Sequence, residues 1–428
     1  MPRFARNDGQ RGNRDDDVFS HRNINQVNTP SSATQALPLT GLRVVEFTHM
    51  VMGPTCGMVL ADMGAEVIKV EPIEGDRTRH LLGVGTGFFP MFNRNKKSIA
   101  IDLHHSAGAD VARKLAASAD VVLENFKPGT MHKYALDYAA LSSVNERLIY
   151  VSHKGFLPGP YEHRTALDEV VQMMGGLAYM TGRPGDPLRA GTSVNDIMGG
   201  LFGAIGALGA LIQRGITGKG QQVQSALFEN NVFLMGQHML QYAMTGKPAA
   251  PMPARISPWA VYDIFTVKDG EQIFLAAVSD AQWLTFCDAL GLDDLKLDPQ
   301  YASNNDRVRA RTTLLPLLRS RLASRSAAEL TALLEAHELP FAPIRKPEEL
   351  YDDEHLLATG GLVDITLPDG ERAGQTVQTA LFPFTMDGQR LGVRLNPPTL
   401  GEHTTQLLAA LGYSDAAIDT LRAHHAVG

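Results

Sequence analysis

Cysteine and tryptophan are scarce in this chain. Its 428 residues include only two of each, and Cys56 and Cys287 lie far apart in the sequence. Two thiols in a chain of this length indicate a reducing compartment and argue against a disulfide framework. C-x-x-C and H-E-x-x-H motifs are absent, and adjacent histidines such as His104 and His105 cannot share one helical face. The sequence therefore predicts no metal site.

The chain also lacks a long apolar run and a strong charge of either sign. Its longest apolar stretch, Ile197 to Ile212, is shorter than the roughly 20 residues of a membrane span. Five glycines within it indicate a buried helix that packs closely against another backbone. No apolar segment of a secretory signal follows the first residues. The net charge of −7 and pI near 6.1 argue against nucleic-acid and anionic-membrane partners. We expect a cytoplasmic protein.

The common nucleotide and acyl-transfer motifs are missing as well. The one glycine-rich candidate, Gly83-Val-Gly-Thr-Gly87, has the wrong spacing for dinucleotide binding, and no strand precedes it directly. Neither a P-loop nor a G-x-S-x-G motif occurs. If the protein transfers acyl groups, carboxylates remain as its candidate nucleophiles.

What the sequence does contain is an alternation of apolar strands and helices. Apolar strands that alternate with helices predict an α/β fold with a parallel sheet covered on both faces. The carboxyl ends of such strands form the expected ligand-binding edge. The strands are expected at 42–47, 67–70, 98–103, 121–123 and 148–151.

Two further regions flank this α/β part. Residues 1–37 are polar and are expected to form a disordered extension. A proline-rich linker begins near residue 246, and hairpin and helix patterns through residue 345 predict a smaller α+β domain. Lys268-Asp-Gly270 is the expected turn of its first hairpin.

Asp196 is the most informative carboxylate. It stands directly before the predicted glycine-rich helix, in Gly191-Thr-Ser-Val-Asn-Asp196. From spacing alone, a helix N-cap is the favoured interpretation. The same position suits a nucleophile, because the positive end of the helix would keep its pKa low. Adjacent glycines would leave room for an acyl group and amides for an oxyanion.

Basic side chains follow the predicted strands. Lys133 and Lys154 lie on the expected ligand-binding edge, together with Arg79. A single lysine at such an edge is usually only solvated. Two lysines and an arginine together could bind the phosphates of a nucleotide-like ligand.

Several ordered motifs resemble those of the class III CoA transferases, which include formyl-CoA and carnitine CoA transferases and α-methylacyl-CoA racemase. The resemblance runs from about residue 38 to the C-terminus. Its motifs are Val44-Val-Glu-Phe-Thr-His-Met-Val-Met-Gly-Pro54, Gly64-Ala-Glu-Val-Ile-Lys-Val-Glu71, Met91-Phe-Asn-Arg-Asn-Lys-Lys-Ser98, Ala119-Asp-Val-Val-Leu-Glu-Asn-Phe-Lys-Pro-Gly129, Thr217-Gly-Lys-Gly-Gln221 and Leu400-Gly-Glu-His-Thr404.

This resemblance implies a CoA transferase that acts on an acyl-CoA and a small carboxylic acid, with Asp196 as its nucleophile. It implies a Rossmann-like large domain at 38–245, a small domain at 246–345 and a segment at 346–428 that completes the large domain. An interlocked homodimer is also implied. CoA is a substrate here, and no permanently bound cofactor is implied. The implied CoA-contacting residues are Val51, Met52, Ile101, Leu103, Asn125, Phe126, Lys133 and Lys154.

The sequence departs from the family pattern at several positions. Leu167-Asp168 replaces the His-Asp of the racemases, and leucine cannot transfer a proton. Val51 replaces a glutamine of formyl-CoA transferase, and Pro72 replaces an arginine that binds phosphate there. Residues 255–259 replace its glycine-rich loop, although their amides could still stabilise an oxyanion. An acyl-CoA isomerase and a non-catalytic CoA-binding protein remain as alternatives.

Overall fold

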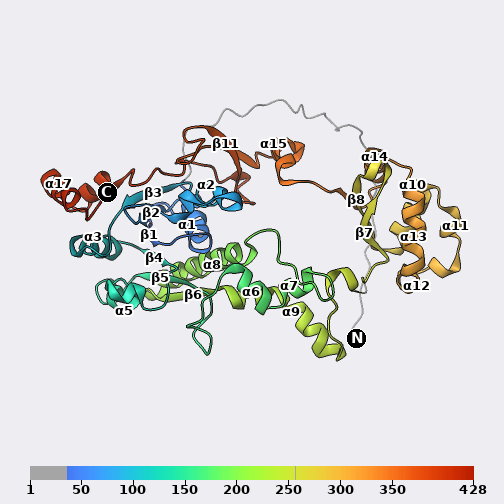
Figure 1. The fold of residues 1–428 in the computed structure, drawn as a ribbon, viewed down its shortest axis with the longest axis horizontal. Helices are drawn as coiled ribbons and strands as arrows, with labels where there is room; N and C mark the ends of the chain where they lie inside the picture. Colours follow the sequence, from blue (N-terminus) through green and yellow to red (C-terminus); the bar gives the residue numbers. More distant parts are fainter. Residues whose placement is uncertain (1–35, 256) are drawn as a thin grey trace, which may run out of the picture. The chain divides into compact units, whose positions relative to one another are not determined.

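The computed structural model describes residues 36–255 and 257–428 (Figure 1). The expected disordered extension, residues 1–37, lies outside the described residues except for Ala36 and Leu37. From Leu37 onward the chain forms one compact unit.

A six-stranded parallel sheet organises the first part of this unit, so the predicted α/β class is confirmed. Its strand order is β3-β2-β1-β4-β5-β6, and every neighbouring pair is parallel. All five strands expected from the sequence are present, and β6 was not expected. The strands are β1 (Arg43–Phe47), β2 (Glu66–Glu71), β3 (Lys96–Ala100), β4 (Val121–Glu124), β5 (Ile149–Lys154) and β6 (Gln222–Ala226).

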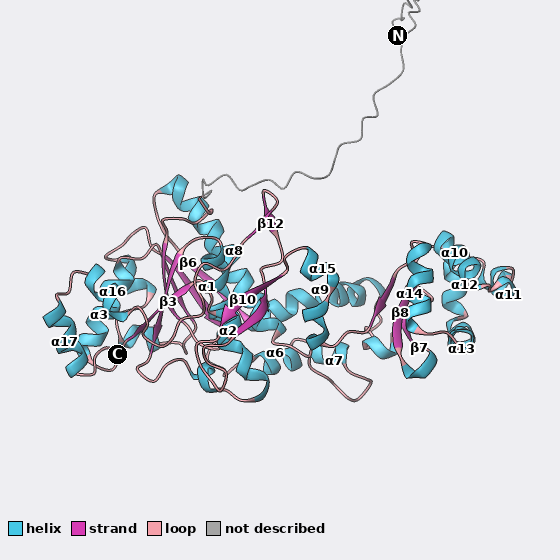
Figure 2. Ribbon diagram, turned by 90° about the horizontal axis from the view of Figure 1, so that it is seen from above, coloured by secondary structure: helices cyan, strands magenta, loops and turns pink. Residues whose placement is uncertain are grey.

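Helices cover both faces of this sheet (Figure 2). Side chains alternate along each strand, so Val151 packs with α1 (Met52–Asp62) and α8 (Val194–Thr217), whereas Tyr150 packs on the opposite face. That second face carries α3 (Ser106–Ala117), α5 (Tyr138–Ser142), α16 (Thr404–Ala410) and α17 (Asp415–Ala423). The last two helices bring the end of the chain back to the sheet. The remaining helices of the first part are α2 (Phe88–Phe92), α4 (Thr130–Lys133), α6 (Asp168–Met174), α7 (Leu177–Thr181) and α9 (Leu227–Thr245).

Glycines allow α8 to pack very closely against its neighbours. A Cβ at Gly199 would lie 2.3 Å from Met52 Cε, and one at Gly200 would lie 2.5 Å from the Met52 carbonyl oxygen. A Cβ at Gly203 would lie 2.3 Å from His153 Nε2. These contacts confirm the close backbone packing expected of this segment. With 24 residues and a mean hydropathy of 1.4, α8 is long and apolar enough to span a membrane, but core helices of soluble proteins often share these two properties.

Residues 261–343 form an antiparallel sheet with its own hydrophobic core. The predicted hairpin is confirmed: β7 pairs with β8, and Asp269 and Gly270 have φ of 60° and 79° in the turn. The strands are β7 (Val261–Thr266), β8 (Gln272–Ala277) and β9 (Phe341–Pro343), and the helices are α10 (Asp280–Leu290), α11 (Asp293–Lys296), α12 (Asn304–Arg309), α13 (Arg311–Leu322) and α14 (Ala327–Ala336). Beyond them follow α15 (Glu354–Ala358), β10 (Leu362–Thr366), β11 (Thr376–Ala380), β12 (Thr385–Met386) and β13 (Gln389–Arg390).

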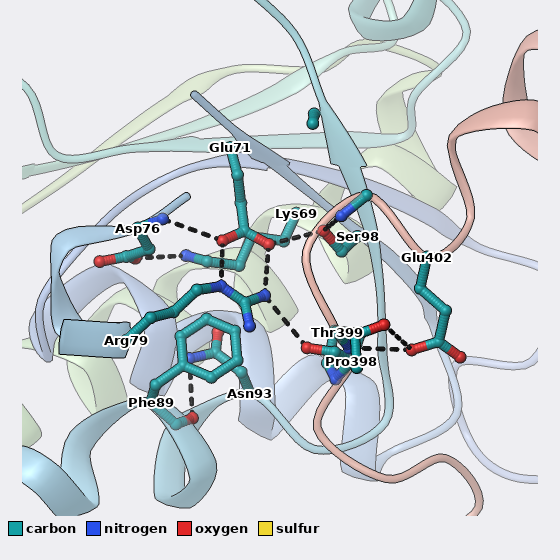
Figure 3. Close-up of polar contacts among 12 residues, drawn as sticks. Lys69, Glu71, Asp76, Arg79, Phe89, Asn93, Ser98, Pro398, Thr399 and Glu402 are labelled. Atoms are coloured by element: carbon teal, nitrogen blue, oxygen red, sulfur yellow. Dashed lines mark hydrogen bonds and ion pairs between the residues drawn. The ribbon is translucent and has the colours of Figure 1, made fainter. Parts of the chain in front are cut away.

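Arg79 is part of a buried ionic network and is not free to bind phosphate, which contradicts the expectation for this residue. Its guanidinium donates to both carboxylate oxygens of Glu71, each at 2.8 Å, and to the Pro398 carbonyl at 3.0 Å (Figure 3). The Phe89 ring covers the guanidinium at 3.6 Å. Glu71 also accepts from Ser98 Oγ at 2.6 Å. The network therefore holds β2 and β3 to the returning C-terminal segment.

Candidate active site

The loops that follow β1 and β4 meet at the point where the strand order reverses, which is where open α/β sheets bind ligands. Asn125 joins the two loops: its side chain accepts from the His49 amide at 3.0 Å and donates to the His49 carbonyl at 2.7 Å. The His49 ring stacks on Phe126 with centroids 5.5 Å apart. Burial lowers the pKa of the His49 imidazole, which favours its neutral form at neutral pH.

Val51 and Met52 lie where α1 begins. Both are buried, and Val51 packs with Ile197, the residue after Asp196. No side chain caps the first turn of α1. An uncapped helix N-terminus carries amide donors and a partial positive charge that suit an anionic group.

Ile101 and Leu103 follow β3 at the same edge of the sheet. The Ile101 side chain is buried in the core, and its backbone forms a bridge with Val427. Leu103 is half-buried against the same core. A ligand at this position can therefore contact the backbone of Ile101 but not its side chain.

The two lysines at this edge differ in their surroundings. Lys133 is exposed on α4, and its side chain has no hydrogen-bond or ion-pair partner among the described residues. Lys154 Nζ lies 2.7 Å from the buried carboxylate of Glu124 and donates to the Phe126 carbonyl at 2.8 Å. Lys154 thus holds the β4 and β5 loops together and has less free charge for a ligand than Lys133.

Asp196 lies in the first turn of α8 and is half-buried. The helix starts earlier than expected, at Val194, and its N-cap residue is Ser193. Asp196 is therefore not the N-cap, and the capping interpretation is wrong. Gly199 and Gly200 make room for Met52 and the rest of α1 rather than for an acyl group.

A second carboxylate caps the helix instead. Asp168, 4% exposed at the start of α6, accepts from the amides of Asn195 at 2.7 Å and Asp196 at 3.0 Å. The Val194 and Ile197 amides donate to backbone carbonyls. All four amides at this helix terminus are therefore satisfied within the chain. The expectation that amides beside Asp196 would stabilise an oxyanion is wrong for these four.

The expected low pKa of Asp196 is also contradicted. Burial, together with the nearby carboxylates of Asp168 and Glu169, raises the pKa of Asp196 to about 7. Loss of water contact and like charge both disfavour the ionised form. A carboxyl with a pKa near 7 is about half ionised at neutral pH and is more basic than an ordinary aspartate.

Three contributors to this site were not assigned roles from the sequence. In the sequence, Asp168 stands out only as the residue after Leu167, which replaces the histidine of the racemases. Gln172, one helical turn later, donates to Asp168 and accepts from the Ala190 amide at 2.8 Å. The His49 ring forms part of the β1 loop. The Asp168-to-Gln172 spacing placed both on one helical face, but no sequence pattern indicated that this face meets another helix terminus.

The candidate oxyanion loop at 255–259 is described only in part, because Ile256 lies outside the described residues. Its role stays a prediction. Among residues 36–255 and 257–428, no cluster of three or more metal-binding side chains was found.

Comparison with known proteins reveals relatives along nearly the whole chain. The profile of "CoA-transferase family III" matches residues 39–404. An acyl-CoA transferase from Fusarium pseudograminearum is 34% identical, over 92% of this chain and 90% of the relative. A succinate–glutarate CoA-transferase from Agrobacterium fabrum is 33% identical, over 87% and 96%. A formyl-CoA:oxalate CoA-transferase from Rhodopseudomonas palustris is also 33% identical, over 89% and 95%.

Solved structures show the same fold. A CAIB/BAIF family protein from Brucella suis superimposes with a TM-score of 0.78 at 35% identity, covering 88% of this chain and all of that one. A hypothetical protein from Mycobacterium tuberculosis gives a TM-score of 0.75 at 30% identity, with coverage of 87% and 99%.

Proposed function

The chain belongs to CoA-transferase family III and is an enzyme that transfers coenzyme A, and from this premise we propose that Asp196 is the nucleophile that carries the transfer. The observation that carries the proposal is the position of this carboxyl. It is half-buried, has a pKa near 7, and lies on a helix packed against the uncapped start of α1.

In the proposed reaction, the Asp196 carboxylate attacks the carbonyl carbon of the donor thioester. The carbon–sulfur bond breaks, which gives an acyl-aspartyl anhydride and the CoA thiolate. The thiolate then attacks the aspartyl carbonyl, releasing the donor acid and leaving an aspartyl-CoA thioester. The acceptor carboxylate repeats these two steps in reverse. Four moderate covalent steps replace one difficult exchange, and no water, electron or net proton is consumed.

We place CoA along the carboxyl edge of the sheet. The amides of Val51 and Met52 would bind an anionic part of the ligand at the start of α1. The ligand would contact Asn125 and Phe126 in the loop after β4. It would contact Leu103 and the Ile101 backbone in the loop after β3. Lys133 and Lys154 would contribute positive charge. The amides at the start of α8 already donate hydrogen bonds within the chain. We therefore place the oxyanion donors elsewhere, either at the start of α1 or in residues 255–259.

The acids are best sought among small dicarboxylates. Four relatives from three organisms carry names that join succinyl-CoA or succinate to glutarate, citramalate or malate, at 32–33% identity. We therefore propose succinyl-CoA as the first donor to try. Formyl-CoA and oxalate would be tried after it, because Val51 and Pro72 differ from the pattern of the formyl-CoA transferases.

The test is a screen of acyl-CoA donors against acid acceptors, read by mass spectrometry of the new thioester. Turnover in the presence of hydroxylamine should leave a hydroxamate on the peptide that contains Asp196. Asp196→Ala should bind CoA with unchanged affinity, form no product and trap no hydroxamate. A wild-type hydroxamate on any other residue would remove Asp196 from this role.

The alternatives predict different products. An isomerase would exchange the α-proton of an acyl-CoA with solvent deuterium, whereas a transferase of this kind would not. Leu167, where the racemases carry a histidine, is 60% exposed and offers no base. A protein that only binds CoA would give no product with any pair of substrates.

We also propose a homodimer. Two helices expose apolar side chains along one face each: Ile205, Ile212 and Ile216 on α8, and Phe233, Leu240 and Met244 on α9, all more than 60% exposed. Monomeric proteins rarely expose so many large apolar side chains together. The interlocked arrangement and the division at 38–245, 246–345 and 346–428 are further proposals, as is a cytoplasmic location.

Light scattering should give twice the chain mass of 46.4 kDa. Phe233→Glu should give a monomer, because a charge would be buried in the interface. Leu297→Glu provides the control: Leu297 is 79% exposed but belongs to the smaller antiparallel part of the chain. A wild-type monomer, or equal effects of both variants, would contradict the proposal.

A further inference from the structure

Asp168 and Gln172 together hold the segment that leads into α8. Gln172 is completely buried, and its Nε2 donates to Asp168 Oδ1. Its Oε1 accepts from the Ala190 amide, while Asp168 Oδ2 accepts from the Asn195 and Asp196 amides. Two side chains of α6 thus fix three backbone amides across the seven residues from Ala190 to Asp196.

The helix has no cap of its own to replace them. Its N-cap residue, Ser193, makes no side-chain hydrogen bond to the first turn. Without Asp168, the Asn195 and Asp196 amides would lose their acceptor, and the first turn that carries the Asp196 side chain would fray. The direction of the Asp196 carboxyl therefore depends on Asp168.

We propose that Asp168 is a positioning residue that fixes the Asp196 carboxyl through hydrogen bonds to the first turn of α8 and places a negative charge beside it. The proposal rests on the function proposed above for Asp196. A basic carboxylate is the better nucleophile, and one that titrates near ambient pH is still substantially ionised. Burial is the largest cause of the raised pKa of Asp196, and the Asp168 carboxylate is the largest charged contributor, which agrees with this role.

Other titratable groups on the elements that pack against α8 contribute less to Asp196. Glu169 on α6 also raises the pKa of Asp196, but it is exposed and paired with Arg189 at 2.6 Å. From β5, the pKa of the buried His153 falls to about 4, so it carries no charge, and Lys154 is paired with Glu124. Among the remaining groups, Cys56 and Asp62 on α1 and Glu229 and His238 on α9 are not contributors to this pKa.

The test separates the charge of Asp168 from its hydrogen bonds to the start of α8. Asp168→Asn retains an acceptor for the Asn195 and Asp196 amides but removes the charge and the acceptor for Gln172 Nε2, whereas Asp168→Ala removes all three. Glu169→Gln is the matched control, since it removes a negative charge from the adjacent, exposed position. The Asp196 carboxyl is titrated directly by infrared difference spectroscopy in the unliganded protein, with Asp196→Asn identifying its band.

In Asp168→Asn, the Asp196 titration and the acid limb of kcat/KM should both move to lower pH by on the order of one unit. The high-pH plateau of kcat/KM should stay within about threefold of wild type, whereas Asp168→Ala should lose at least about tenfold of it. Glu169→Gln should move the titration less than Asp168→Asn does. If both Asp168 variants lower the plateau alike and leave the titration unchanged, Asp168 is only structural and the proposal fails. The titration needs no substrate, so it decides the charge effect even if no transferase activity is found.

Discussion

Replacing the proposed nucleophile should stabilise the protein, and the gain should depend on pH. Asp196 ionises at about 7 in the folded chain, against 3.8 for an ordinary aspartate. At about 1.4 kcal/mol for each pH unit, the ionised group would destabilise the fold by at most roughly 4 kcal/mol. Solvent contact at this half-buried position reduces the value toward roughly 2 kcal/mol. Asp196→Asn keeps the shape of the side chain and carries no charge.

The sign follows from which state binds the proton more tightly. Because the folded protein holds the Asp196 proton up to about pH 7, the wild type loses stability as the pH rises from about 4 to 7. Asp196→Asn has no such loss. The two proteins should be equally stable near pH 4, and the variant should be more stable by roughly 2–4 kcal/mol above pH 7.

Urea unfolding of both proteins at one protein concentration, from pH 4 to 8.5, measures this difference. A fixed concentration keeps subunit association from contributing to the comparison. A stability difference that does not change with pH, or a variant less stable than wild type at pH 8, would refute the argument that burial and like charge dominate at Asp196.

Five further substitutions test separate parts of the structure. Arg79→Met should lower the free energy of unfolding by about 3 kcal/mol, because it leaves a buried carboxylate unpaired, and isothermal titration should find CoA affinity unchanged. Gly200→Ala should destabilise by about 1–3 kcal/mol through its clash with α1, whereas Gly215→Ala, which meets open space in the same helix, should gain up to about 1 kcal/mol. Lys133→Ala should weaken CoA binding by about 1 kcal/mol, most at low salt, without changing the melting temperature. Lys154→Ala should lower both CoA affinity and the melting temperature, since its partner carboxylate is buried.

Most of the sheet could be predicted from the sequence, because its strands are buried on both faces and so are continuously apolar. The strands at 42–47 and 121–123 are examples. Strand β6 could not be predicted this way: Gln222, Val223 and Gln224 are partly exposed at the edge of the sheet, so they lack the apolar signal. The Asp269-Gly270 turn was predictable because its left-handed backbone requires such residues.

The functional site was predictable only in outline. The sequence singled out Asp196 as the candidate nucleophile, and this role stays a prediction; its environment depends on Asp168, 28 positions away, and on α1, which comes far earlier in the chain. Burial of Asp196 and the approach of the Asp168 carboxylate depend on tertiary packing and leave no local pattern in the sequence, so the expected direction of the pKa shift was wrong. Arg79 was misassigned for a similar reason. Its two hydrogen bonds to Glu71 and its contact with the Phe89 ring depend on the packing of η1 (Arg77–His80) against α2.

The same close packing that defines α8 also bears on the proposed placement of the substrate. Gly199 and Gly200 admit α1, which brings the uncapped start of that helix next to the Asp196 turn. The amides of the Asp196 turn are already used by Asp168, so the terminus of α1 is the free helix end at this position. In the proposed mechanism, α8 would supply the nucleophile and α1 would supply donors for negative charge. Such a division would let a negative residue raise the basicity of Asp196 without competing for the groups that would stabilise the transition state.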